Sequence, residues 1–74
     1  MNRTKKVLEI LADRFVFDVD DLTMEMKLKE ELGCDSLDRE VIAEELDHFF
    51  GVDLAHGAEC EWITVADVIN AAKP

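Results

Sequence analysis

Gly33-Cys34-Asp35-Ser36-Leu37-Asp38 is the stretch of this chain that predicts most about its structure. It places a serine between carboxylates at the point where a turn leads into a helix with apolar periodicity. Aspartate and serine are both preferred at helix starts, and an acidic side chain in the first turn interacts favourably with the helix dipole. On these residues alone, the hexapeptide predicts the start of a helix, with Ser36 exposed there.

The residues after Ser36 predict an amphipathic helix that ends at Gly51, because glycine commonly follows the last helical residue. With successive residues turned by about 100°, one side is apolar and should face the core: Ile42, Leu46, Phe49 and Phe50. The opposite side mixes acids with two aliphatic residues: Leu37, Glu40, Val41, Glu44, Asp47 and His48. We expect this second side to be exposed and able to dock a partner.

The rest of the chain predicts two more helices and a long loop. After Thr4, which we expect to cap the first helix, apolar residues recur at helical spacing: Val7, Leu8, Ile10, Leu11 and Phe15. Thr64 caps a last segment that can pack inward through Val65, Val68, Ile69 and Ala72. Residues 16–34 suit a long loop with a short helical turn around Leu28–Leu32, and a further turn can form within residues 52–62. We expect an all-α fold: a small four-helix bundle of three main helices and one short helix, with a long first loop.

Length and charge limit the possible functions. Residues 1–74 suffice for one small domain with a modest core and no substrate cleft of its own. The 18 acidic and 8 basic residues give a net charge of −10, which repels nucleic acid and anionic membranes and favours partners with basic surfaces. Two cysteines are too few for a disulfide framework, and no signal segment or apolar run of membrane-spanning length occurs. A monomeric cytoplasmic protein is expected.

Ser36 lacks the partners that a catalytic serine needs. A nucleophilic serine requires a base that is itself oriented by a third group. His48 lies three helical turns away, roughly 18 Å along the predicted helix, and His56 has no second acid-base pair beside it. A zinc site from these histidines with Cys34 and Cys60 lacks a short ligand pair. We therefore predict no catalytic residue and no metal site, so that any reaction at Ser36 needs a second enzyme.

A family resemblance gives the hexapeptide its context. Residues 31–38, Glu-Leu-Gly-Cys-Asp-Ser-Leu-Asp, resemble the prosthetic-group attachment motif of acyl carrier proteins. Lys-Lys-Val-Leu at 5–8 resembles part of the family's first helix, and Asp-Asp-Leu-Thr at 20–23 the end of its first loop. Phe-Phe-Gly-Val at 49–52 and residues 63–69 fall where such proteins end the second helix and begin the last. The resemblance covers nearly the whole chain.

The resemblance implies a stand-alone carrier. Ser36 would be esterified by a 4′-phosphopantetheine arm, taken from coenzyme A by a phosphopantetheinyl transferase, and Asp35 would help to position the magnesium of that transferase. The arm would hold acyl groups as thioesters and deliver them to enzymes of fatty acid, lipid or specialised acyl biosynthesis. Such acyl-transferring or synthase enzymes carry basic docking patches, and the contacts expected for them here are Leu37, Asp38, Val41, Glu44 and Asp47.

Departures from the family pattern leave the pathway open. Carriers of fatty acid synthesis commonly have an apolar residue at the position of Glu40 and methionine or a similar residue at that of Glu44, and the loop through residues 15–19 is a few residues longer than usual. A dedicated carrier for one specialised pathway is therefore at least as well supported by the sequence as the general fatty acid carrier. Glu61-Trp62 faintly resembles D-alanyl carriers, which usually follow the serine with methionine. Outside the family, the alternative is an unmodified acidic helical interaction module in which Ser36 is dispensable.

Overall fold

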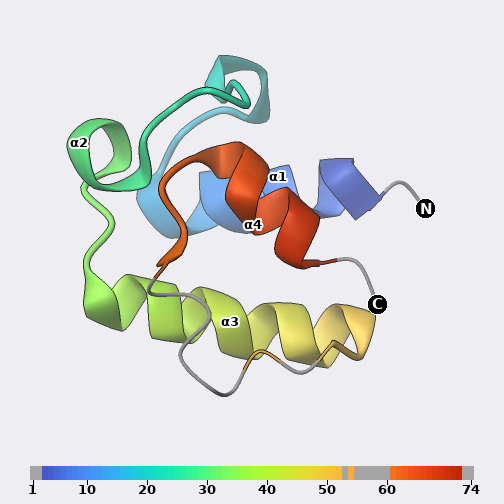
Figure 1. Cartoon of the computed structure of the whole chain (residues 1–74). Helices are drawn as coiled ribbons and strands as arrows, with labels where there is room; N and C mark the ends of the chain where they lie inside the picture. The colour runs from blue at the N-terminus through green and yellow to red at the C-terminus, as the bar shows by residue number, and fades with distance from the viewer. Residues whose placement is uncertain (1–2, 53, 55–60, 73–74) are drawn as a thin grey trace.

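The computed structural model describes residues 3–52, 54 and 61–72. Its elements are α1 (Arg3–Phe15), the 3-10 turn η1 (Val19–Asp21), α2 (Leu28–Leu32), α3 (Ser36–Phe50) and α4 (Val65–Ala71). Figure 1 shows α4 crossing α1, while α3 runs along the other side of the fold, and α1 contacts both helices. Within these ranges there is no β-strand, so the prediction of an all-α fold with three main helices and one short helix is confirmed.

The first helix begins earlier than predicted. Because α1 already includes Arg3, Thr4 lies inside its first turn, and the prediction that Thr4 caps the helix is wrong. A capping residue needs a non-helical backbone, which a residue inside the turn does not have. The predicted apolar face is confirmed, with every member buried or partly buried against the core: Val7, Leu8, Ile10, Leu11 and Phe15.

The first loop is fastened to the start of α4 by backbone hydrogen bonds. The Leu28 N–H donates to the Ile63 carbonyl at 2.9 Å, and the Val65 N–H donates to the Met26 carbonyl at 3.0 Å. These bonds flank an isolated antiparallel bridge. They give backbone groups of a largely irregular segment the partners that such groups need when they leave water.

Two short turns interrupt this loop. The helical turn expected around Leu28–Leu32 is present as α2, with both of these leucines buried. The turn η1 was not predicted, because a single turn in an acid-rich segment leaves no apolar repeat in the sequence. The turn expected within residues 52–62 falls mostly on positions outside the described residues.

The core face of α3 differs from the prediction at one end. Ile42 and Leu46 are fully buried as expected, and Phe50 is partly buried. Phe49 is 47% exposed, so its assignment to the core is wrong. The buried stripe is turned towards Ala43, which is also buried, and this leaves Phe49 at the edge of the stripe. There the Lys6 ammonium lies 4.1 Å from the centre of the Phe49 ring, a cation–π contact.

The start of α4 confirms the role predicted for Thr64. Thr64 is the N-cap residue, and the Asp67 carboxylate accepts hydrogen bonds from the Thr64 N–H at 3.0 Å and the Ile63 N–H at 2.8 Å. These bonds satisfy two backbone donors at the start of the helix. The apolar residues predicted to pack inward are all buried: Val65, Val68, Ile69 and Ala72.

Three helices end in the same left-handed backbone conformation. Gly33 follows α2 with φ 71° and Gly51 follows α3 with φ 66°, as the sequence predicts for Gly51. The residue after α1 is Val16, with φ 60°, and the Phe17 N–H closes the turn on the Ala12 carbonyl at 2.9 Å. Glycine adopts this conformation without a steric penalty, whereas a β-branched residue is strained in it.

Replacing the strained valine should therefore stabilise the fold. We expect Val16→Gly to raise the free energy of unfolding by about 1 kcal/mol, because it removes the steric penalty of the left-handed conformation. Gly51→Ala is the matched control and should lower the free energy by about the same amount, since no heavy atom lies within 4 Å of the added Cβ and the cost is conformational. Urea unfolding measures both variants. A destabilised Val16→Gly would show that the valine side chain stabilises the fold.

The cap of α4 should make part of the stability depend on pH. The Thr64 N–H, and then the Ile63 N–H, lower the pKa of Asp67 below its ordinary value of 3.8. Because the folded pKa is the lower one, the stabilisation is present above the unfolded pKa and is lost as the pH falls through the folded pKa. We expect Asp67→Ala to cost about 1 kcal/mol at neutral pH, and the difference from the parent to vanish in acid. Urea unfolding across the pH range tests this, with Glu9→Ala as control; a difference independent of pH would contradict it.

Candidate functional site

Ser36 is the first residue of α3 and is exposed. Its neighbours make the cap: Asp35 is the N-cap residue, and its Oδ1 accepts a hydrogen bond from the Asp38 N–H at 2.9 Å. In return, the Asp38 Oδ2 accepts one from the Asp35 N–H at 3.2 Å. Because these two carboxylates make the cap, the Ser36 hydroxyl takes no part in it. No hydrogen bond holds that hydroxyl within the described ranges.

Asp38 also joins α3 to α1. Its Oδ1 accepts hydrogen bonds from the Arg14 Nη2 at 2.7 Å and Nε at 3.0 Å. The Asp35 N–H, followed by the Arg14 guanidinium, holds the pKa of Asp38 below its ordinary range. Asp38 therefore stays ionised at neutral pH. Its sequence position indicated an acid near the helix dipole, but not the ion pair that joins α3 to α1.

A surface hollow of about 480 Å³ lies beside Ser36. Gly33, Asp35 and Ser36 line it, together with two cations, Lys29 from α2 and Arg39 from the first turns of α3. Arg39 also donates a hydrogen bond to the Trp62 carbonyl, which ties the helix start to the segment before α4. Two cationic side chains and the amide end of a long helix make this a setting for an anion bound at Ser36.

The two cations of this hollow were not assigned to the site from the sequence. Arg39 had a readable signal, since it is the one basic residue between positions 35 and 53 and lies three positions after Ser36, on the same side of the helix. Lys29 had none. It reaches the site only because the turn at Gly33 places α2 next to the start of α3.

The residues predicted to contact partners differ in how far they are exposed. Leu37 is 64% exposed, Glu44 is exposed, and Val41 is half-buried. Asp47 is half-buried, and its Oδ1 accepts a hydrogen bond from the Leu54 N–H at 2.9 Å. Asp47 and the ion-paired Asp38 therefore both make contacts within the fold. The structure thus leaves Leu37, Val41 and Glu44 as the more available part of this face.

Cys34 lies beneath this site as an apolar core residue. It is 2% exposed, and burial raises the pKa of its thiol above the ordinary value. A protonated, buried thiol is a poor nucleophile. The expectation that Cys34 acts as a small apolar residue agrees with this, while Cys60 and His56 lie outside the described residues.

The described residues contain no cluster of side chains able to hold a metal ion. His48 lies on α3 twelve residues beyond Ser36, with its ring edge against the Phe49 ring at 5.3 Å between centroids. None of the helices in these ranges is long and apolar enough to span a membrane.

Comparison with known proteins identifies the family. Over 72 residues the chain is 33% identical to an acyl carrier protein of Rickettsia bellii (strain OSU 85-389), with 97% of this chain and 89% of the relative covered. The chain belongs to the acyl carrier protein family. A second acyl carrier protein, from Rickettsia bellii (strain RML369-C), is 32% identical over 72 residues, which cover 97% of this chain and 84% of that relative. No family model matches the chain. Its function is that of a carrier.

Proposed function

We propose that Ser36 is the attachment point of a 4′-phosphopantetheine arm. The observation that carries this proposal is the exposed hydroxyl at the first position of α3, with the cap supplied by Asp35 and Asp38 instead. A serine that caps its own helix would have its oxygen engaged with backbone amides. Here the oxygen is accessible to an enzyme that approaches from solvent.

The surroundings of Ser36 fit the phosphodiester that such an arm would bring. Lys29 and Arg39 line the adjacent hollow and can offset its negative charge. The amide end of α3, a helix of 15 residues, favours an anion at the same place. When bound, the arm supplies a terminal thiol on which an acyl group is held as a thioester.

The attachment reaction needs a separate transferase. The Ser36 oxygen forms a bond to the phosphorus next to the pantetheine of coenzyme A, the bond from that phosphorus to adenosine 3′,5′-bisphosphate breaks, and the serine proton goes to a base. His48 is too far along α3 to act as that base. The transferase must therefore supply both the base and the metal, so the carrier acts as a substrate and not as a catalyst.

Asp35 is proposed to help hold the transferase's magnesium. Its backbone position beside Ser36 places a carboxylate next to the reacting hydroxyl, and the residue is exposed. Carboxylate oxygens are the ligands that Mg²⁺ prefers. One carboxylate can thus serve the helix cap and the metal, because its two oxygens offer separate lone pairs.

Partner enzymes are proposed to dock on the exposed side of α3 through basic patches. Glu40 and Glu44 lie exposed on that helix, and Leu37 supplies an apolar contact. Complementary charge raises the association rate and selects partners, while the buried apolar contact adds affinity. Carriers of fatty acid synthesis commonly have an apolar residue at the position of Glu40 and methionine or a similar residue at that of Glu44. Because both residues are acids here, we favour a partner set specific to one acyl pathway.

Incubation with coenzyme A, magnesium and a broad-specificity phosphopantetheinyl transferase tests the attachment. We expect the intact mass to rise by one phosphopantetheine in the parent and to stay unchanged in Ser36→Ala. A parent that stays unmodified while a known carrier is modified in the same tube would instead favour the acidic interaction module. Asp35→Asn adds a sharper comparison, since asparagine caps helices as well as aspartate. Slower modification with unchanged stability would assign Asp35 to the metal.

Charge reversal on α3 tests the docking face. We expect Glu44→Lys to lower the rate of modification about tenfold at low salt, with a smaller effect at high salt, because it removes attraction to a basic patch. Glu25→Lys makes the same change of net charge on the exposed first loop and is the matched control. Equal rates for the two variants would show that only the overall charge matters and would remove Glu44 from the docking face.

A further inference from the structure

Two apolar side chains after α1 are exposed without a structural reason. Val16 is 91% exposed, and Phe17 beside it is 37% exposed. Val16 is also held in the left-handed conformation, which a valine adopts only at a cost. Neither burial nor backbone preference accounts for a valine at this position.

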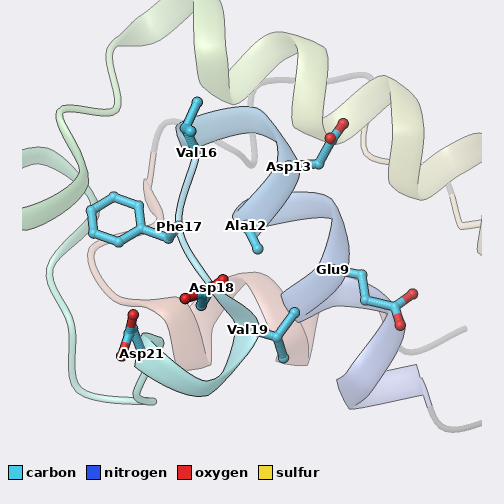
Figure 2. A pocket seen from close by; sticks show the side chains of 8 residues that line it. All are labelled: Glu9, Ala12, Asp13, Val16, Phe17, Asp18, Val19 and Asp21. Atoms are coloured by element: carbon cyan, nitrogen blue, oxygen red, sulfur yellow. The ribbon is translucent and has the colours of Figure 1, made fainter.

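These side chains line a hollow between the end of α1 and η1. Its volume is about 620 Å³, and Ala12 and Val19 add two further apolar side chains to its lining (Figure 2). The hollow shares no lining residue with the one beside Ser36. It lies where the chain leaves α1 and enters the first loop.

The same hollow carries a concentration of unpaired negative charge. Four carboxylates line it, Glu9 and Asp13 from α1 and Asp18 and Asp21 from the segment that follows (Figure 2). No basic side chain lines the hollow. In the part of the chain that the structure describes, none of these carboxylates makes a side-chain hydrogen bond or ion pair, in contrast to Asp38 with its arginine. Bringing cations close to them would lower their mutual repulsion.

We infer that this hollow is a second docking surface, whose occupant is a basic amphipathic helix of a partner protein. An apolar side chain of that helix covers Val16 and Phe17, and its lysines or arginines pair with the surrounding carboxylates. A second copy of this chain is a poor occupant, because each copy carries a net charge of −10. The apolar side chains favour a protein segment over a free cation. The surface does not depend on modification of Ser36, so it can be tested on the unmodified protein.

A designed peptide can test this surface directly. The probe is a synthetic helix with leucine along one face and lysine along the other, titrated into ¹⁵N-labelled protein. A peptide with serine in place of leucine keeps the charge and removes the apolar face. We expect the first peptide to shift the amides of residues 12–21, and the second to bind about tenfold more weakly.

Two matched double variants decide where the peptide binds. Val16→Asn with Asp18→Asn removes one apolar and one acidic side chain from the hollow, and asparagine tolerates the left-handed backbone. Ile63→Asn with Glu61→Gln makes an equivalent change at exposed residues elsewhere. We expect only the first pair to abolish the shifts at residues 12–21. Shifts confined to α3, unchanged shifts in the first pair, or the same shifts produced by raising the protein concentration alone would each overturn the inference.

Discussion

The reciprocal hydrogen bonds between Asp35 and Asp38 are the constraint on which the site depends. They fix the first turn of α3, and so they place Ser36 at its first position with an unused hydroxyl. Through Arg14 the same Asp38 carboxylate connects that turn to the end of α1. A change at Asp38 therefore affects the helix start, the contact with α1 and the presentation of the serine together, and these effects cannot be separated by that substitution alone.

Local signals allowed much of the fold to be predicted. The structure confirms the helix end at Gly51, the cap at Thr64 and the buried spacing of Ile42 and Leu46. Each of these predictions depends on only a few neighbouring residues. Features decided by tertiary contacts were missed or misplaced. Phe49 has the spacing of a core residue, yet it lies at the edge of the buried stripe. No helical pattern could reveal which way that stripe turns once α1 has packed against α3.

The candidate site also combines residues that local sequence predicted with residues that only tertiary contacts bring in. The sequence predicted Ser36 at an exposed helix start, with Asp35 among the residues preferred there and Asp38 as an acid suited to the helix dipole. The reciprocal bonds between the two aspartates were not predicted. The cations beside the serine come from separate elements, and Lys29 enters the site only through the turn at Gly33. Arg14 pairs with Asp38 across 24 positions. Pairings at such distance follow from how helices are placed, and a single sequence carries no direct record of them.

The backbone bonds between the first loop and the start of α4 have a consequence for synthesis of the chain. They join Leu28 to Ile63 and Met26 to Val65, so the loop that leads into the serine is fastened by residues that are translated well after that serine. Contacts so far apart in sequence form late, because the chain between them must first be closed into a loop. On the ribosome, a nascent chain thus bears its serine well before it has the contacts that hold the serine in place.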